Sequence, residues 1–166
     1  MMSTEAAHKS RWETFEAVFG IPFLAGVALQ FAVPVSLPGG FVTPASVLVG
    51  VVLVVVGAAL VALARRELTR SGQPTGPGLP TGKVVTTGVF SISRNPIYLG
   101  GVCAMVGLAL AVDLPWALLL YLPGLVACHH VLIVPEERYL SARFGEEYEA
   151  YAASVHRWVG RDRRVG

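Results

Sequence analysis

The chain has 166 residues, of which 54% are hydrophobic and only 14% charged, and its mean hydropathy is +0.60. Soluble domains carry about a quarter charged residues, so the composition favours one membrane domain over residues 1–166 and argues against a soluble protein. The net charge of +2 is too small to indicate a nucleic-acid partner.

Apolar stretches predict an all-α membrane protein with about four transmembrane helices. They cover residues 17–35, 43–64, 97–112 and 115–134. A spanning helix needs about 20 apolar residues, which the second and fourth stretches provide. Pro22 and Pro34 interrupt the first stretch, and the third is long enough only if its helix begins within residues 93–95. The polar N-terminus lacks the layout of a cleaved signal peptide, so we expect the first stretch to remain as an anchor.

The basic residues predict the orientation in the membrane. All 13 Lys and Arg residues fall on one side of the predicted topology, in the N-terminal segment, the loop 65–96 and the C-terminal segment 135–166. The two opposite loops contain none. Basic residues collect on the cytoplasmic side of membrane proteins, so we expect both termini and the loop 65–96 to be cytoplasmic.

The last two predicted spans would form a hairpin around a turn at residues 113–115. Polar clusters flank this hairpin at residues 94–98 and 135–140, and the turn would bring them together at the cytoplasmic face. Beyond them, an apolar stripe recurs every three or four residues, as on one face of a helix that bends near Gly145. It comprises Leu140, Phe144, Tyr148, Tyr151, Val155 and Trp158. This amphipathic segment could lie on the bilayer, or it could fold over the hairpin and close a cavity.

The polar clusters carry a resemblance to a known family. The matching segments are Thr87–Phe90, Ser93–Gly100, Glu136–Leu140, Arg143–Tyr148 with Tyr151, and Val155–Trp158. In order and spacing they resemble the isoprenylcysteine carboxyl methyltransferase family and its phospholipid methyltransferase relatives. The resemblance covers about residues 86–158, whereas the first two spans are similar only as membrane helices.

The resemblance implies an integral membrane enzyme that transfers a methyl group from S-adenosylmethionine to a lipidic or hydrophobic acceptor. The acceptor it implies is a carboxylate of the isoprenylcysteine type, although relatives use phospholipid amines or small thiols. The cofactor site would lie where the last spans meet the C-terminal segment. Eukaryotic members usually have His where this chain has Asn95, and Asn cannot titrate near neutral pH.

Methyl transfer from a sulfonium is an in-line displacement, so the residues expected to act are those that position the reactants. A carboxylate acceptor is already ionised and needs a cation to recruit it. We predict Arg157 for this role, followed by Arg94, with Glu137 beside them as a third catalytic residue. Either arginine could instead anchor the protein at the lipid headgroups.

The residues predicted to bind the cofactor come from both polar clusters and the tail: Asn95, Tyr98, Glu136, Glu137, Tyr148 and His130. Glu136 and Glu137 would hold the ammonium or ribose, and because neighbours on a helix point about 100° apart, we favour Glu137. These acids could instead complement a helix N-terminus after Pro135. Likewise, Tyr98 could be an interface aromatic and Asn95 a helix cap.

His129 and His130 lie near the cytoplasmic end of the fourth predicted span. One of them could serve as a base for an amine or thiol acceptor, and we expect only one to face inward. No metal site is predicted, since no ligands have suitable spacing. Small residues such as Gly100 and Ala104 would let an acceptor from the bilayer pass between helices.

Two further functions compete with the enzyme. A non-enzymatic four-helix scaffold or transporter fits the composition, but a proton-coupled transporter would carry acidic residues near the middle of a span, where this chain has none. The tail could also be a docking surface for another protein. The sequence indicates the bilayer and a hydrophobic acceptor as partners and does not indicate an oligomeric state.

Overall fold

The structure is a computed structural model, and it describes residues 15–37, 43–75 and 80–161. The described residues form helices and no strand apart from one isolated bridge between Val155 and Arg161. In chain order the helices are α1 (Phe15–Ala32), α2 (Pro44–Arg70), α3 (Pro96–Ala111), α4 (Pro115–Ala127), α5 (Val134–Phe144) and α6 (Glu146–Ser154). A short 3₁₀ turn, η2 (Gly88–Ser91), precedes α3, and a π-helical segment, η3 (Cys128–Ile133), joins α4 to α5. The all-helical prediction is confirmed for the described residues.

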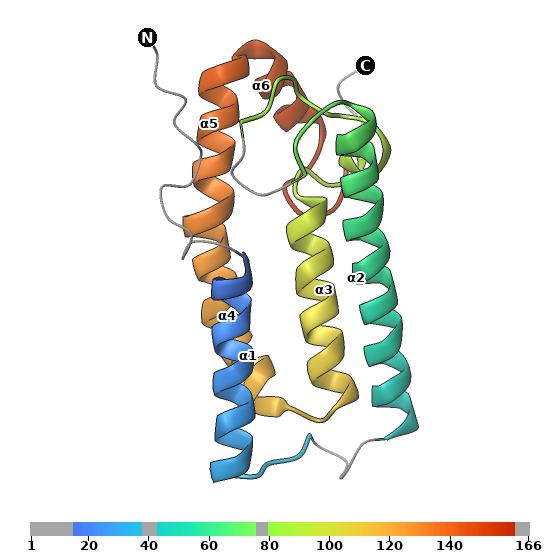
Figure 1. Cartoon of the computed structure of the whole chain (residues 1–166), viewed down its shortest axis with the longest axis vertical. Helices are drawn as coiled ribbons and strands as arrows, with labels where there is room; N and C mark the ends of the chain where they lie inside the picture. Colours follow the sequence, from blue (N-terminus) through green and yellow to red (C-terminus); the bar gives the residue numbers. More distant parts are fainter. Residues whose placement is uncertain (1–14, 38–42, 76–79, 162–166) are drawn as a thin grey trace.

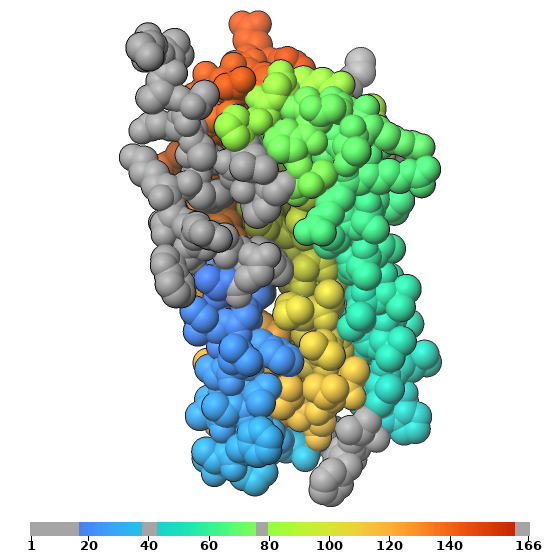
Figure 2. Space-filling model, in the orientation of Figure 1, coloured from blue at the N-terminus to red at the C-terminus, as the bar shows by residue number. Residues whose placement is uncertain are grey.

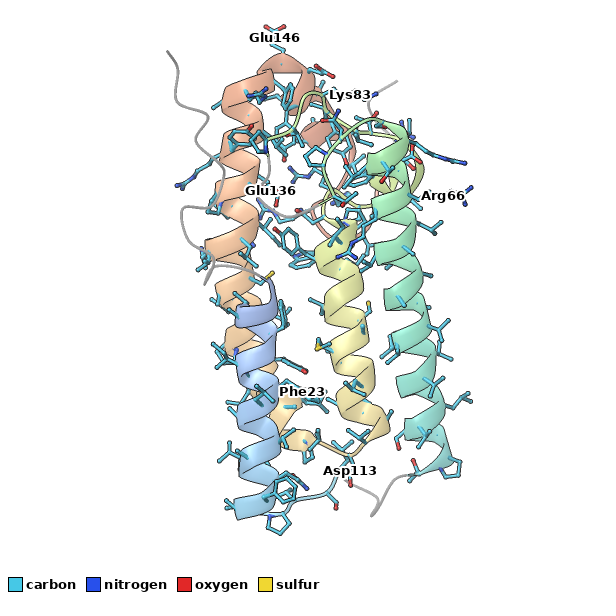
Figure 3. All side chains as sticks on the ribbon, viewed as in Figure 1. Phe23, Arg66, Lys83, Asp113, Glu136 and Glu146 are labelled. Carbon is cyan, nitrogen blue, oxygen red and sulfur yellow. The ribbon has the colours of Figure 1, made fainter. Side chains whose placement is uncertain are left out.

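The long helices run side by side, with α2 packed along α3 and α1 packed along α4 (Figure 1). The segment that follows α2, together with α6, gathers at one end of this bundle. Arg66, Lys83 and Glu146 lie toward that end, whereas Asp113 lies at the other (Figure 3). The bundle therefore has one end rich in polar chemistry.

Glycines bring α2 and α3 into backbone contact. A Cβ added to Gly50 would lie 2.6 Å from the carbonyl oxygen of Gly107, and one added to Gly100 would lie 2.6 Å from that of Gly57. Small residues permit this close approach between membrane helices, where van der Waals packing drives association. Gly100 and Ala104 therefore lie in the α2–α3 contact, and the passage of an acceptor between helices stays a prediction.

Two of the four predicted spans have the length and composition to cross a membrane. They are α2 and the continuous helix Pro115–Phe144, whereas α1 and α3 are shorter apolar helices. The helix α3 does not begin within residues 93–95, as a full span would need, but at Pro96, and it has 16 residues. Proline favours the first helical turn and pushes the residue before it out of the α conformation, which fixes this start. In contrast, α1 continues through Pro22 without ending.

The fourth helix does not end at Val134 as predicted but continues to Phe144. Pro135 has no N–H to donate and its ring would crowd the carbonyl of Val131 in a regular helix. The wider π turn over Cys128–Ile133 includes that carbonyl and lets the helix pass the proline. Glu136 and Glu137 therefore lie inside a continuous helix, and they do not complement a free helix N-terminus.

The hairpin turn is formed as predicted, between α3 and α4. Asp113 adopts φ 52°, a left-handed conformation that reverses the chain. Its carboxylate accepts a hydrogen bond from the N–H of Leu37 at 2.9 Å, and the indole of Trp116 donates to the carbonyl of Val33 at 2.8 Å. The turn thus brings residues 94–98 and 135–140 to the same end of the bundle.

Candidate functional site

The C-terminal segment is bound to the chain that enters α3. The backbone N–H of Arg94 donates to the carbonyl of His156 at 3.1 Å, and the N–H of Gly160 donates to the carbonyl of Ile92 at 2.9 Å. The Asn95 side-chain amide donates to the carbonyl of Arg157 at 3.2 Å. Asn95 forms no side-chain cap on α3, so its predicted alternative role as a helix cap is wrong. This strap holds residues 156–160 across the N-terminus of α3.

Glu137 connects three parts of the site through its carboxylate. Arg157 donates to both carboxylate oxygens, from Nε at 2.9 Å and from Nη2 at 2.6 Å. Arg94, which precedes α3, approaches the same group with Nη1 at 3.3 Å. Hydrogen bonding to Glu137 raises the pKa of Arg157. A bidentate pair fixes direction as well as distance, so Glu137 orients both guanidinium groups.

Glu136 lies next to this ion pair and bonds to α3. The Tyr98 hydroxyl donates to a Glu136 carboxylate oxygen at 2.8 Å, across 38 residues of sequence. Tyr98 is buried, with 4% of its surface exposed. The Glu136 carboxylate is half-buried and is satisfied by this bond, which also holds α5 against α3.

A cavity of about 100 Å³ lies beside these groups. The start of α3 and Glu136 form one side of the cavity, and Tyr148 and Tyr151 of the tail form a second side. The third side, called the roof below, consists of residues 74–75 and 81–85 of the segment after α2. The lining includes Thr81, Lys83, Phe90, Arg94, Asn95, Tyr98, Glu136, Leu140, Tyr148 and Tyr151. The space-filling view shows the segment after α2 and the tail meeting at this end (Figure 2). The volume is below the roughly 300–1,000 Å³ of typical ligand pockets.

The tail closes the cavity rather than merely lying beside the bundle. Tyr148, Tyr151 and Val155 form a buried cluster with Val84 of the roof. The Tyr151 hydroxyl donates to the carbonyl of Phe90 at 2.7 Å. Burial raises the pKa of Tyr148 to about 12, with the charge of Glu137 adding to the rise and Arg94 opposing it. Burial likewise raises the pKa of Tyr151.

The helix bends after Phe144 as predicted, since Gly145 has φ 53° and α6 begins at the next residue. The residues of the predicted apolar stripe do not all contact the same part of the molecule. Tyr148 and Tyr151 face the cavity, whereas Trp158 packs against the main core of the bundle.

A second cavity, an open groove of about 490 Å³, lies between α3 and the α4–η3 helix. It is lined by Leu99, Val102, Leu125, Val126, His129, His130 and Trp158. The rings of His129 and His130 meet edge to face, with centroids 4.8 Å apart. Both rings line this open groove, with His129 half-buried and His130 exposed, so the expectation that only one histidine faces inward stays a prediction.

The predicted site residues thus fall in three places. The first cavity is lined by Arg94, Asn95, Tyr98, Glu136 and Tyr148, and Glu137 and Arg157 form the ion pair beside it. The sequence favoured Glu137 over Glu136 for the cavity, but Glu136 lines it. His130, predicted for the cofactor, lies in the groove instead.

The sequence analysis missed Thr81, Lys83 and Phe90, which come from the loop. The Thr81 hydroxyl and Arg94 Nε are buried and have no hydrogen-bond partner within the described part of the chain. Buried polar atoms are normally paired, so these two mark places for ligand atoms. The Thr87–Phe90 match in the sequence was the one signal that could have placed the loop at the site.

Comparison with known proteins gives one match. The sequence model of the phospholipid methyltransferase family matches residues 45–147, from α2 to the start of α6. No curated protein matches the chain. No solved structure matches it. The matched region contains both polar clusters and more than half of the chain, and the protein therefore belongs to the phospholipid methyltransferase family of membrane methyltransferases.

Proposed function

We propose that the protein transfers a methyl group from S-adenosylmethionine to a hydrophobic acceptor at the polar end of the bundle. The observation that supports this most is the carboxylate of Glu136 in a cavity walled by aromatic side chains and buried polar atoms. We further propose that this end faces the cytoplasm, on the distribution of Lys and Arg in the sequence.

The residues of the first cavity fit the proposed cofactor by chemistry. S-Adenosylmethionine supplies a methyl group on a positively charged sulfur. Glu136 would bind its ammonium, and Phe90, Tyr148 and Tyr151 offer apolar faces to the adenine. The free hydrogen-bonding capacity of Thr81 and Arg94 would be used by polar atoms of the nucleoside.

The chain then contributes mainly by orientation. Glu137 holds Arg157 and Arg94, and Arg157 fixes Asn95 through its carbonyl, so the groups around the reacting atoms are preorganised. Positioning of this kind can supply much of the acceleration of a displacement. An isoprenylcysteine-type carboxylate, the acceptor that the resemblance implies, would lie against Arg157.

A second acceptor class is favoured by a specific observation. Two arginines and two glutamates meet at the site, so Arg157 is paired with Glu137 rather than free to recruit a carboxylate, and Lys83 is the further cation in the cavity lining. The neighbouring groove presents two imidazoles. These groups suit an acceptor that must lose a proton, such as an amine or a thiol.

Calorimetric titration of S-adenosylmethionine and S-adenosylhomocysteine into the protein in detergent tests the proposed cofactor site. We expect saturable binding by the wild type. Glu136→Gln should lower the affinity for S-adenosylmethionine at least tenfold, because hydrogen bonds to charged groups contribute about 1.5–3 kcal/mol.

The exposed Glu147 on α6 provides the matched control, and Glu147→Gln should bind as the wild type does. A folded wild-type protein that binds neither ligand would refute the proposal. The scaffold or transporter interpretation would then lead.

A further inference from the structure

We propose that the C-terminal strap, residues 156–160, lies against the lipid bilayer at the level where headgroups meet acyl chains. Ile92 and Val159, called the strap patch below, form its lipid contact, and this contact helps to keep the strap closed across the start of α3. The partner is the bilayer itself, and the inference does not rest on the proposed methyl transfer.

The strap patch consists of two large apolar side chains that are exposed at the polar end of the bundle. Ile92 is 56% exposed and Val159 is 63% exposed. The N–H of Gly160 donates to the carbonyl of Ile92 at 2.9 Å, so the two residues belong to neighbouring stretches of backbone. Ser93 and Asn95, which follow Ile92, are buried. The segment before α3 therefore exposes an apolar side chain and buries polar ones, which is the reverse of the usual preference in water.

The strap is fixed to the protein from its inner side. The N–H of His156 donates to the carbonyl of Gly160 at 2.8 Å, which closes the strap into a tight loop. Arg157 is held by its ion pair, and Trp158 packs against the main core of the bundle. Val159 is the exposed apolar residue of this loop. The strap thus has an inner side bound to protein and an outer side that carries an apolar group.

The adjoining surface indicates the bilayer as the partner. Trp158 also lines the open groove between α3 and the α4–η3 helix, where its aliphatic neighbours include Leu99 and Val126. Val126 is 59% exposed and belongs to the continuous helix Pro115–Phe144, which is long enough to cross a membrane. An exposed apolar side chain on a spanning helix meets lipid. The strap therefore borders a lipid-facing wall, and Val159, next to Trp158, extends that wall toward the polar end.

The position of the strap along the bundle fits the membrane interface. The N–H of Arg94 donates to the carbonyl of His156, so the strap lies beside the residues just before α3 begins at Pro96 (Figure 1). Tryptophan is enriched where membranes meet water, and long basic side chains reach from there to the headgroups. The strap supplies Trp158, and the exposed Arg161 follows it.

A lipid partner also fits the small size of the strap patch. Specific protein–protein interfaces involve roughly 20–30 residues on each partner. Two side chains cannot supply such an interface, whereas a bilayer accepts any apolar surface that reaches its acyl chains. Opening of the strap would return Ile92 and Val159 to water, so the bilayer stabilises the closed strap.

The first test measures the depth of the strap patch in lipid nanodiscs. Spin labels are attached singly to Ile92→Cys, Val159→Cys, Leu122→Cys and Ala153→Cys in the full chain, with Cys103→Ser as background. Oxygen collides preferentially with labels among acyl chains, and a water-soluble nickel chelate collides with labels in water. A chain that carries Cys103→Ser alone gives the background signal.

The two other positions bracket the expected result. Leu122 is 59% exposed on α4 within the spanning helix, and Ala153 is exposed on α6. We expect the ratio of oxygen to chelate collisions at residues 92 and 159 to lie between the ratios at these two positions. Ratios equal to that at Ala153 would place the strap patch in water and overturn the inference.

The second test measures strap opening by hydrogen exchange at the amides of Arg94 and Gly160, again in nanodiscs. Val159→Gln should speed exchange at both amides at least about threefold, because a polar side chain is stabilised less by lipid. An ordinary substitution at a water-facing position would stay within roughly a twofold change. Val159→Ile, which keeps the apolar character, is the matched control and should exchange as the wild type does.

Unchanged exchange in Val159→Gln would overturn the role of lipid in closing the strap. Labels at residues 92 and 159 that neither oxygen nor the chelate reaches would show a covering protein, such as a second copy of this chain, and would also overturn the inference. Neither test involves the cofactor, so failure of the proposed function would leave this inference standing.

Discussion

The first prediction concerns how strongly the C-terminal strap is held closed by Arg157, which joins it to Glu137. Arg157→Ala removes two charge-assisted hydrogen bonds of 2.9 and 2.6 Å. Each such bond contributes about 1.5–3 kcal/mol when well shielded. The loss of free energy is smaller here for two reasons. The side chain of Arg157 is 33% exposed, so solvent screens its charge, and Glu137 still has Arg94 as a partner at 3.3 Å in the variant. We therefore expect a total loss of about 2–3 kcal/mol.

The assay is hydrogen exchange at the backbone amides that the strap protects. The N–H groups of Arg94 and Gly160 bond across the strap to His156 and Ile92. A loss of about 2–3 kcal/mol in strap closure corresponds to exchange roughly 30- to 150-fold faster at these two amides. Amides in the middle of α2 should exchange as in the wild type.

Arg157→Lys and Arg138→Ala sharpen this test. Lysine cannot reproduce the planar fork, so Arg157→Lys should show an intermediate effect. Arg138 is exposed on α5, and Arg138→Ala should leave both amides unchanged. Unchanged protection in Arg157→Ala would refute the reasoning that the Glu137 ion pair holds the strap.

Three further predictions follow from packing, titration and the loop. Gly57→Ala should destabilise the protein by about 1–3 kcal/mol through overpacking against α3, whereas Gly20→Ala, which meets no neighbour, should be neutral or stabilising in detergent thermal unfolding. Because the pKa of Tyr148 is raised to about 12, its neutral form stabilises the fold, and this contribution is lost as pH rises from about 10 to about 12. Tyr148→Phe should flatten the stability profile in that window, and an unchanged profile would contradict the burial argument. The Gln73 side-chain oxygen accepts hydrogen bonds from the N–H of Gly82 at 2.5 Å and of Lys83 at 3.3 Å. Gln73→Ala should therefore lower the affinity for the cofactor severalfold. Equal affinity of variant and wild type in calorimetry would show that these bonds do not hold the roof in place.

Much of the architecture could be predicted because it depends on composition and local chemistry. Apolar runs located the four long helices, and the left-handed turn at Asp113 made the hairpin that joins the two polar clusters. The contact between Tyr98 and Glu136 follows from that hairpin. The bend at Gly145 follows from a positive φ that glycine adopts easily.

Other features depend on packing that the sequence alone does not specify. The π turn lets the helix continue through Pro135, which the sequence pattern did not indicate, and His130 lines the groove rather than the first cavity. Nothing in the sequence decided between Glu136 and Glu137, since neighbours on a helix point about 100° apart and either could face the cavity. The loop's Gly and Pro residues indicate neither helix nor strand, so nothing predicted Thr81 and Lys83 over the cavity. The glycines of α2 gave no sign of their α3 partners, because pairing between distant segments is a tertiary property.

Photochemical cross-linking of labelled S-adenosylmethionine shows whether the cavity beneath the tail holds this cofactor. We expect label on peptides containing Phe90, Tyr148 or Tyr151, removal of this label by excess S-adenosylhomocysteine, and less label on Glu136→Gln. Competable label confined to peptides outside the cavity, or no competable label on the folded protein, would refute the proposed cofactor site.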